Sequence, residues 1–183
     1  MPESRPVPGG ARSYDSKTIA LHWVTVLLVA ALWTIGQTID FWPRGALRVD
    51  YRSLHVVLGV LLAGVIVVRL HWRTTRGTRL PVEGPLLLAI AARIVHWALY
   101  ALVCATVVLG ILTAFAQNTS LFGLFSLPSP GDRALAHLLH GWHALGANAV
   151  LILAGLHAAA ALMHHTLLRD DTLRRMLPRA LRG

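Results

Sequence analysis

The sequence predicts an all-α protein whose four helices cross a lipid bilayer and pack as one bundle. Hydrophobic residues make up 55% of the 183 residues and charged residues 14%, and the mean hydropathy is +0.59. Soluble globular chains carry about 25% charged residues, so this composition excludes most soluble classes of protein. The hydrophobic residues also gather in four tracts with almost no charge, as membrane-spanning helices require.

Each tract predicts one helix, because about 20 apolar residues at about 1.5 Å per residue cross the hydrocarbon core. The first tract, residues 19–39, has no charged residue. The second has no charged residue over residues 53–68 and continues through Arg69, whose side chain then faces the bundle or the interface. The third follows Arg93, and the fourth lies beyond Arg133. The expected helices are about residues 18–39, 53–72, 92–116 and 138–164.

The segments outside these tracts are expected to be tails and loops. About residues 1–13, rich in proline, glycine and arginine, predict a flexible tail, and residues 74–85 predict a connector. Residues 117–132 predict a longer loop with a short interfacial helix around residues 121–125. Because no domain boundary is visible, residues 1–183 are expected to form a single domain.

The charge balance predicts how the chain lies in the membrane. Lys and Arg number 17 against 8 Asp and Glu, a formal net charge of +9, which in a soluble protein would indicate nucleic-acid binding. In a membrane chain the same excess sets orientation, because cytoplasmic segments retain basic residues. All basic residues except four fall on the side that holds both termini, so we expect a multi-pass membrane protein with cytoplasmic termini and no nucleic-acid partner. The four exceptions are Arg44, Arg48, Arg52 and Arg133.

Cysteine content narrows the possible cofactors. The chain has a single cysteine, Cys104. This excludes an internal disulfide framework, a cysteine-rich zinc site, an iron–sulfur cluster held by cysteine ligands and covalent haem attachment through C-x-x-C-H. The ten histidines, many of them inside the apolar tracts, are therefore the candidates for chemistry. Ionisable residues within a membrane are costly and usually functional.

Spacing along the fourth tract predicts two sites. His143 and His157 are fourteen residues apart, close to four helical turns, so both lie on one face about 21 Å apart along the axis. That separation suits two stacked cofactors, one near each membrane surface. The same interval joins pairs on the other three tracts: His22 to Gly36, His55 to Arg69, and His96 to Gly110.

The alternating direction of the helices pairs these histidines. His22 and His157 fall at the inner level, whereas His55 and His143 fall at the outer level. Imidazole is an axial ligand of haem iron, and cofactors in helix bundles are held by side chains on facing helices. The sequence therefore predicts a four-helix bundle that encloses two noncovalent b-type haems, each with two histidine ligands.

The other residues joined by the fourteen-residue interval form an inward-facing stripe with the histidines, and they have expected roles beside these ligands. Gly36 and Gly110 would let a flat macrocycle approach the backbone, and Arg69 would neutralise a propionate. His96 shares the inner level with His22 and competes as ligand or bonds a propionate, and His164 and His165 are expected at the inner interface.

Ordinary explanations of the same residues stay open. Any one intramembrane histidine can have no role other than a hydrogen bond between helices. A zinc site is a second alternative, but it would need ligands that converge at one level. The two glycines can equally serve helix packing, and the four outer arginines can be ordinary solvated loop residues.

Several motifs resemble the bacterial cytochrome b561 family. TIALHW and HVVLG begin the first two helices, and GWH followed by GLHAAAALMHH marks the fourth, which is the most specific part of the resemblance. The resemblance extends from about Tyr14 through nearly the whole chain. The matching segments are residues 18–23, 41–44 (FWPR), 55–59, 141–143, 155–165 and 171–179 (DTLRRMLPR).

The resemblance implies location, ligands and activity, and the implied location is a bacterial inner membrane. Carried onto matching positions, the family ligands are His22 and His157 for the inner haem, and His55 and His143 for the outer haem. The implied activity is that of a superoxide:ubiquinone oxidoreductase, which oxidises superoxide at the periplasmic face and reduces ubiquinone. The outer arginines would then attract the superoxide anion.

Two other functions are alternatives. One is a dihaem cytochrome b subunit that accepts electrons from a dehydrogenase or hydrogenase partner protein and passes them to quinone, although the short loops favour the stand-alone enzyme. The other is a structural membrane protein without a redox cofactor.

Overall fold

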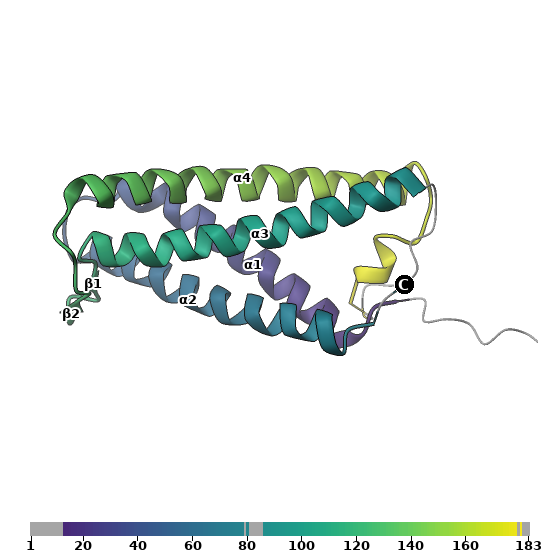
Figure 1. The fold of residues 1–183 in the computed structure, drawn as a ribbon, viewed down its shortest axis with the longest axis horizontal. Helices are drawn as coiled ribbons and strands as arrows, with labels where there is room; N and C mark the ends of the chain where they lie inside the picture. The colour runs from purple at the N-terminus through teal and green to yellow at the C-terminus, as the bar shows by residue number, and fades with distance from the viewer. Residues whose placement is uncertain (1–12, 79, 81–85, 179, 181–183) are drawn as a thin grey trace, which may run out of the picture.

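Four long helices dominate the computed structural model, which describes residues 13–78, 80, 86–178 and 180. They are α1 (Ser16–Thr38), α2 (Ala46–Thr75), α3 (Leu86–Ala116) and α4 (Arg133–Thr166). All four of these helices in the described part of the chain are long and apolar enough to cross a membrane. The predicted class, an all-α transmembrane four-helix bundle, is confirmed (Figure 1).

The helices run alternately up and down, so the bundle has two distinct ends (Figure 1). The tail end holds the start of α1, the end of α4 and the short 3-10 helix η2 (Arg174–Met176). The hairpin end holds the 3-10 helix η1 (Ile39–Phe41) and the strands β1 (Ser120–Leu121) and β2 (Phe125–Ser126). Helix α3 packs mainly on α4, and α1 packs mainly on α2.

Three of the helices extend well beyond the predicted spans. Helix α2 begins at Ala46, α3 at Leu86 and α4 at Arg133. Hydropathy detects only the part of a helix that lies in hydrocarbon, whereas the end of a helix is set by local capping. The Asp132 carboxylate, for example, accepts hydrogen bonds from the backbone N–H groups of Ala134 and Leu135 at 2.9 and 3.0 Å.

The predicted interfacial helix around residues 121–125 is wrong. The segment forms a β-hairpin, in which Ser120 pairs with Ser126 and Leu121 with Phe125. The turn places Phe122 and Gly123 at φ values of 52° and 71°, in the left-handed region that ends a helix. The predicted tail lies outside the described residues except for Ser13, as do residue 79 and residues 81–85 of the predicted connector.

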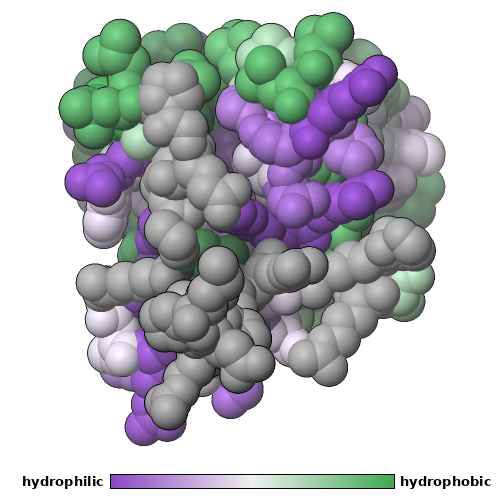
Figure 2. Space-filling model, turned by 90° about the vertical axis from the view of Figure 1, so that its right-hand side faces the viewer, coloured by the Kyte–Doolittle hydropathy of each residue, from purple (hydrophilic) through white to green (hydrophobic). Residues whose placement is uncertain are grey.

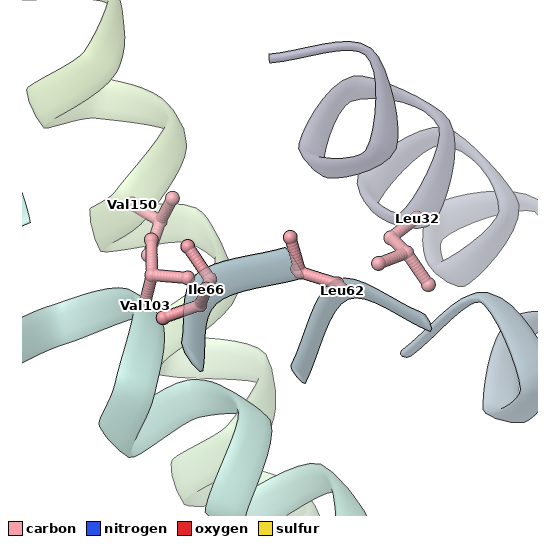
Figure 3. Close-up of a cluster of buried hydrophobic side chains, with 5 residues drawn as sticks. All are labelled: Leu32, Leu62, Ile66, Val103 and Val150. Atoms are coloured by element: carbon pink, nitrogen blue, oxygen red, sulfur yellow. The ribbon is translucent and has the colours of Figure 1, made fainter. Parts of the chain in front are cut away.

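A buried apolar cluster joins the four helices at mid-length (Figure 3). Three of its members form what we call the waist layer: Leu62, Val103 and Val150, which are 4, 7 and 4% exposed. Each lies seven residues from both members of a predicted pair on its helix, as Val150 does between His143 and His157. The waist layer therefore separates the two levels at which the histidines lie. Leu32 and Ile66 complete the cluster.

Many large apolar side chains face outward instead. Leu27, Val67, Ile152 and Leu156 are between 63 and 67% exposed. A soluble bundle would bury such residues, but a lipid bilayer solvates them without cost.

Candidate functional site

The inward stripe predicted from the spacing exists in the structure. His22, His55, His96, His143 and His157 are all partly buried, although each lies on a helix with an outward apolar face. His71, His137 and His140 are exposed. The five histidines of this stripe separate into two groups, one on each side of the waist layer.

At the hairpin end, the structure brings together the predicted outer pair. The ring centroids of His55 on α2 and His143 on α4 are 6.0 Å apart, and the ring planes are nearly perpendicular at 89°. Two metal–imidazole bonds of about 2 Å, added to the distance from each nitrogen to its ring centre, place the centroids of two axial ligands about 6 Å apart. The separation of this pair fits a single metal ion between the two rings.

The predicted glycines lie against these two rings. A Cβ atom on Gly36 would lie 3.3 Å from Cε1 of His55, and one on Gly110 would lie 2.8 Å from Cε1 of His143. A contact of 2.8 Å is closer than real side chains allow, so Gly110 is required for the observed position of the His143 ring. Both glycines therefore belong to the hairpin-end site.

A backbone carbonyl fixes the orientation of His143. Its Nδ1 lies 2.9 Å from the carbonyl oxygen of Thr106, and because a carbonyl only accepts, Nδ1 carries the proton. The lone pair is then on Nε2, which is the arrangement that metal-binding histidines use. Sequence reasoning missed Thr106, although Gly146 gives a signal: a Cβ there would lie 2.6 Å from Thr106 Oγ1, so α3 and α4 approach closely at this point.

The partner histidine has an unfilled bonding position. Nδ1 of His55 is buried and has no hydrogen-bond partner among the residues that the structure describes. A buried polar atom without a partner costs about 1–3 kcal/mol. This orphaned nitrogen is consistent with a site that a further group completes.

At the tail end, three histidines share one level. The rings of His96 and His157 have centroids 5.0 Å apart, and His22 interacts electrostatically with both. His22 also accepts at Nδ1, 2.9 Å from a guanidinium nitrogen of Arg69, and Trp23 lies edge-on to it. The ring that contacts His157 is thus His96, whereas the predicted partner His22 is held by Arg69.

Arg69 has no acidic partner in the described part of the chain. Its guanidinium lies 5.2 Å from the ring centroid of Tyr100, over which Arg73 also lies at 5.9 Å. Among the described residues, neither arginine pairs with a carboxylate. A partly buried cation favours an anion beside it, as the predicted contact with a propionate requires. Sequence reasoning missed Arg73 and Tyr100, which lie four residues after Arg69 and His96.

The donor set fits haem better than a protein-bound zinc ion. Within the described ranges, no group of three or more His, Cys, Asp or Glu side chains converges on one point. Zinc sites need three or four protein ligands, whereas haem iron takes its equatorial ligands from the macrocycle and needs only two axial ones. Paired imidazoles on facing helices of a membrane bundle define the class of membrane b-type cytochromes.

Comparison with known proteins agrees with this class. Residues 13–179 match the family model described as prokaryotic cytochrome b561. The chain belongs to the prokaryotic cytochrome b561 family, which confirms the resemblance seen in its motifs, and it is therefore a bacterial membrane electron-transfer protein that binds b-type haem.

Three curated relatives cover nearly the same length. A protein named probable superoxide oxidase CybB from Yersinia pestis is 30% identical, over 92% of this chain and 97% of the relative. Cytochrome b561 homolog 2 of Escherichia coli is 34% identical over 90% of each chain. Cytochrome b562 of Cereibacter sphaeroides is 30% identical, over 90% of this chain and 94% of the relative.

Proposed function

We propose that this cytochrome is a superoxide:ubiquinone oxidoreductase that binds two haems. The hairpin end faces the periplasm and holds one haem between His55 and His143. The tail end faces the cytoplasm and holds the other between His22 and His157, with Arg69 and His96 beside it. The observation that carries the proposal is the hairpin-end site, where two imidazoles at axial spacing lie against Gly36 and Gly110.

The protein contributes position and charge to the reaction. When bound, haem would supply a one-electron carrier, and the paired histidines are the residues that would hold it. The Thr106 carbonyl keeps the proton of His143 on Nδ1, so that Nε2 is available for the metal. The exposed apolar faces of the helices give a lipid-soluble quinone direct access to the bundle.

The overall reaction balances in electrons and protons. Two superoxide anions each lose one electron and become two molecules of dioxygen. Ubiquinone takes up these two electrons and two protons and becomes ubiquinol. Superoxide would arrive from water at the periplasmic end, and ubiquinone from the lipid.

Basic residues at the hairpin end support an anionic substrate. Arg44 and Arg133 are exposed there, and Arg52 is partly exposed. Arg48 forms an ion pair with Asp40, so its charge is compensated and contributes less. Positive potential near a site raises the local concentration and arrival rate of an anion. The name of the Yersinia pestis relative agrees with this substrate.

Rapid mixing with superoxide tests the activity. The purified haem-loaded protein, mixed with superoxide and a ubiquinone analogue, should show reduced b-type haem bands faster than spontaneous dismutation removes superoxide, and ubiquinol should accumulate. Haem that stays oxidised under these conditions would exclude the proposed activity. Reduction by a dehydrogenase or hydrogenase partner instead would then favour the electron-transfer subunit.

Ligand variants test the assignment of the two sites. His143→Ala should lose about half of the haem absorbance, from the outer site, and His22→Ala a similar amount from the inner site, because iron without one axial ligand binds weakly. Exposed His140→Ala is the matched control and should retain both haems. Loss of the inner haem from His96→Ala but not from His22→Ala would reassign the inner ligand to His96.

A further inference from the structure

The tail end contains a polar pocket that plays no part in the proposed redox chemistry. It lies where the chain leaves α4 and turns toward η2, and its volume is about 240 Å³. Pockets that enclose drug-sized ligands measure roughly 300–1,000 Å³, so this one suits a small polar group. Its lining residues are His165, Arg169, Asp170, Asp171 and Arg174.

The turn that builds the pocket is closely held. Arg169 has a φ of 52°, a left-handed conformation that is uncommon for residues other than glycine. The backbone N–H of Asp170 donates to the His164 carbonyl at 3.1 Å, and the Asp170 carboxylate lies 2.5 Å from His164 Nδ1. The same carboxylate accepts from the backbone N–H of Thr172 at 2.9 Å. These bonds fix the two ends of the turn and place Arg169 at the pocket.

The same hydrogen bonds stabilise the charged form of Asp170, one of the two aspartates that line the pocket. Burial acts to raise the pKa of the Asp170 carboxyl, but hydrogen bonds from His164 and Thr172 outweigh it and lower this pKa to about 2. Asp170 is therefore an anion whose partners are already supplied within the turn. Arg169 and Arg174 then face only one carboxylate, that of Asp171, whose hydrogen bonds are not made within the turn, and their guanidinium groups are the donors that the pocket offers a ligand.

Apolar residues place the pocket at the membrane surface. Leu167 and Leu168 directly precede the turn and are 75 and 54% exposed. Leu162 and Met163, one turn earlier on α4, are also exposed. Figure 2, which views the tail end, shows hydrophilic side chains next to hydrophobic ones on this face. Apolar side chains immersed in lipid would hold the neighbouring arginines at the depth of the phosphate groups.

We propose that this pocket binds the phosphate-bearing headgroup of an anionic phospholipid of the adjacent leaflet. Arg169 and Arg174 donate to the phosphate oxygens, and the acyl chains lie along Leu167 and Leu168. Arginine suits this role because its planar guanidinium donates two parallel hydrogen bonds to a phosphate. The inference rests on the membrane-spanning fold and does not depend on superoxide or quinone chemistry.

Lipid binding to the full-length, haem-loaded protein tests the proposal. In native mass spectrometry from a neutral detergent, phosphatidylglycerol should bind more tightly than phosphatidylcholine of the same chain length. Each arginine contributes about fivefold, so the Arg169→Gln/Arg174→Gln variant should lose most of this preference. Arg44→Gln/Arg133→Gln makes the same charge change at the hairpin end and should keep it.

A third variant predicts a change of opposite sign. Asp171→Asn removes the carboxylate charge that lies beside Arg169 and Arg174 and should tighten phosphatidylglycerol binding by a few-fold. Unchanged haem content and unfolding temperature in detergent would show that all variants are folded. Equal binding of the two lipids, a preference that survives in the tail-end double variant, or weaker binding by Asp171→Asn would overturn the proposal. Full competition by inorganic phosphate would assign the pocket to the free anion instead.

Discussion

At the residue scale, the position of the His143 ring depends on the small groups that surround it. His143 lies against Gly110, and its Nδ1 proton is held by the Thr106 carbonyl. A ligand held in this way does not have to reorient when iron binds, and such contacts raise metal affinity about 10–100-fold. The hydrogen of a glycine and a backbone oxygen are thus part of the site.

Gly110→Ala should displace the His143 ring. The new methyl group would lie 2.8 Å from Cε1, and overpacking of this kind costs about 1–3 kcal/mol. We expect partial loss of the outer haem and a shift in its low-spin electron paramagnetic resonance signal. Gly59→Ala, where a Cβ meets nothing within 4 Å, is the matched control and should leave haem content and spectrum unchanged. Equal behaviour of the two variants would contradict this role of Gly110.

The sequence predicted the depth of each histidine in the membrane better than it predicted which two histidine rings lie in contact. An interval of fourteen residues fixes both depth and face, so His55 and His143 could be paired from topology alone. At the tail end, His22, His96 and His157 share one level, and spacing does not distinguish two imidazoles at equal depth. The contact between Arg69 and His22 depends on side-chain geometry that periodicity does not contain.

At the element scale, one carboxylate connects three segments at the tail end. Asp15 caps α1 by accepting from the backbone N–H of Thr18 at 2.9 Å. It also accepts from Trp72 Nε1 on α2 at 3.0 Å and from the backbone N–H of Thr78 at 3.1 Å. Burial acts to raise the pKa of Asp15, but these hydrogen bonds outweigh it and hold the pKa well below its usual range. The start of α1 is therefore tied to the end of α2.

Asp15→Ala should lower the stability of the protein. Loss of a helix cap costs about 1 kcal/mol, and here two bonds to other segments are lost as well. Because the folded pKa of Asp15 is depressed, its contribution is present above the usual value of 3.8 and is lost as pH falls toward the folded value. Thermal unfolding in detergent should show a lower midpoint for the variant at pH 7 and a smaller difference between variant and wild type in acid. A pH-independent difference would contradict this electrostatic role.

The elements themselves were predictable to different degrees. Membrane spans follow from hydropathy, because lipid selects apolar side chains along a whole helix. The hairpin was missed because its formation depends on distant contacts: the fully buried Ser53 hydroxyl donates to the Ser120 carbonyl and accepts from the Phe122 backbone N–H. No local pattern around residues 121–125 indicates a partner 67 residues earlier in the chain.

At the scale of the whole molecule, the bundle holds two polar compartments apart. Histidines and an arginine lie between the helices at the tail end, and a second group of histidines lies between them at the hairpin end. Leu62, Val103 and Val150 fill the space between these groups. Polar residues near both surfaces would favour penetration of water from each side. We expect the waist layer to be the barrier that keeps the two bodies of water apart.

Polar substitution in the waist layer should therefore open a path for ions. In proteoliposomes that contain a pH-sensitive dye, the wild-type protein should admit protons no faster than protein-free vesicles under an imposed potential. Leu62→Asn/Val103→Asn should increase this flux while both haems remain bound. Leu112→Asn, at a lipid-exposed position, is the control and should not increase it. A waist variant that retains its haems and remains proton-tight would show that the barrier lies elsewhere.

The waist layer thus has a consequence for the energy balance of the cell. An electron can cross packed hydrocarbon by tunnelling, whereas a proton needs a chain of water or polar groups. With a haem on each side, as proposed, these three apolar side chains would let electrons pass and would block protons. A redox protein built in this way exchanges electrons within the membrane without dissipating the proton-motive force that the membrane stores.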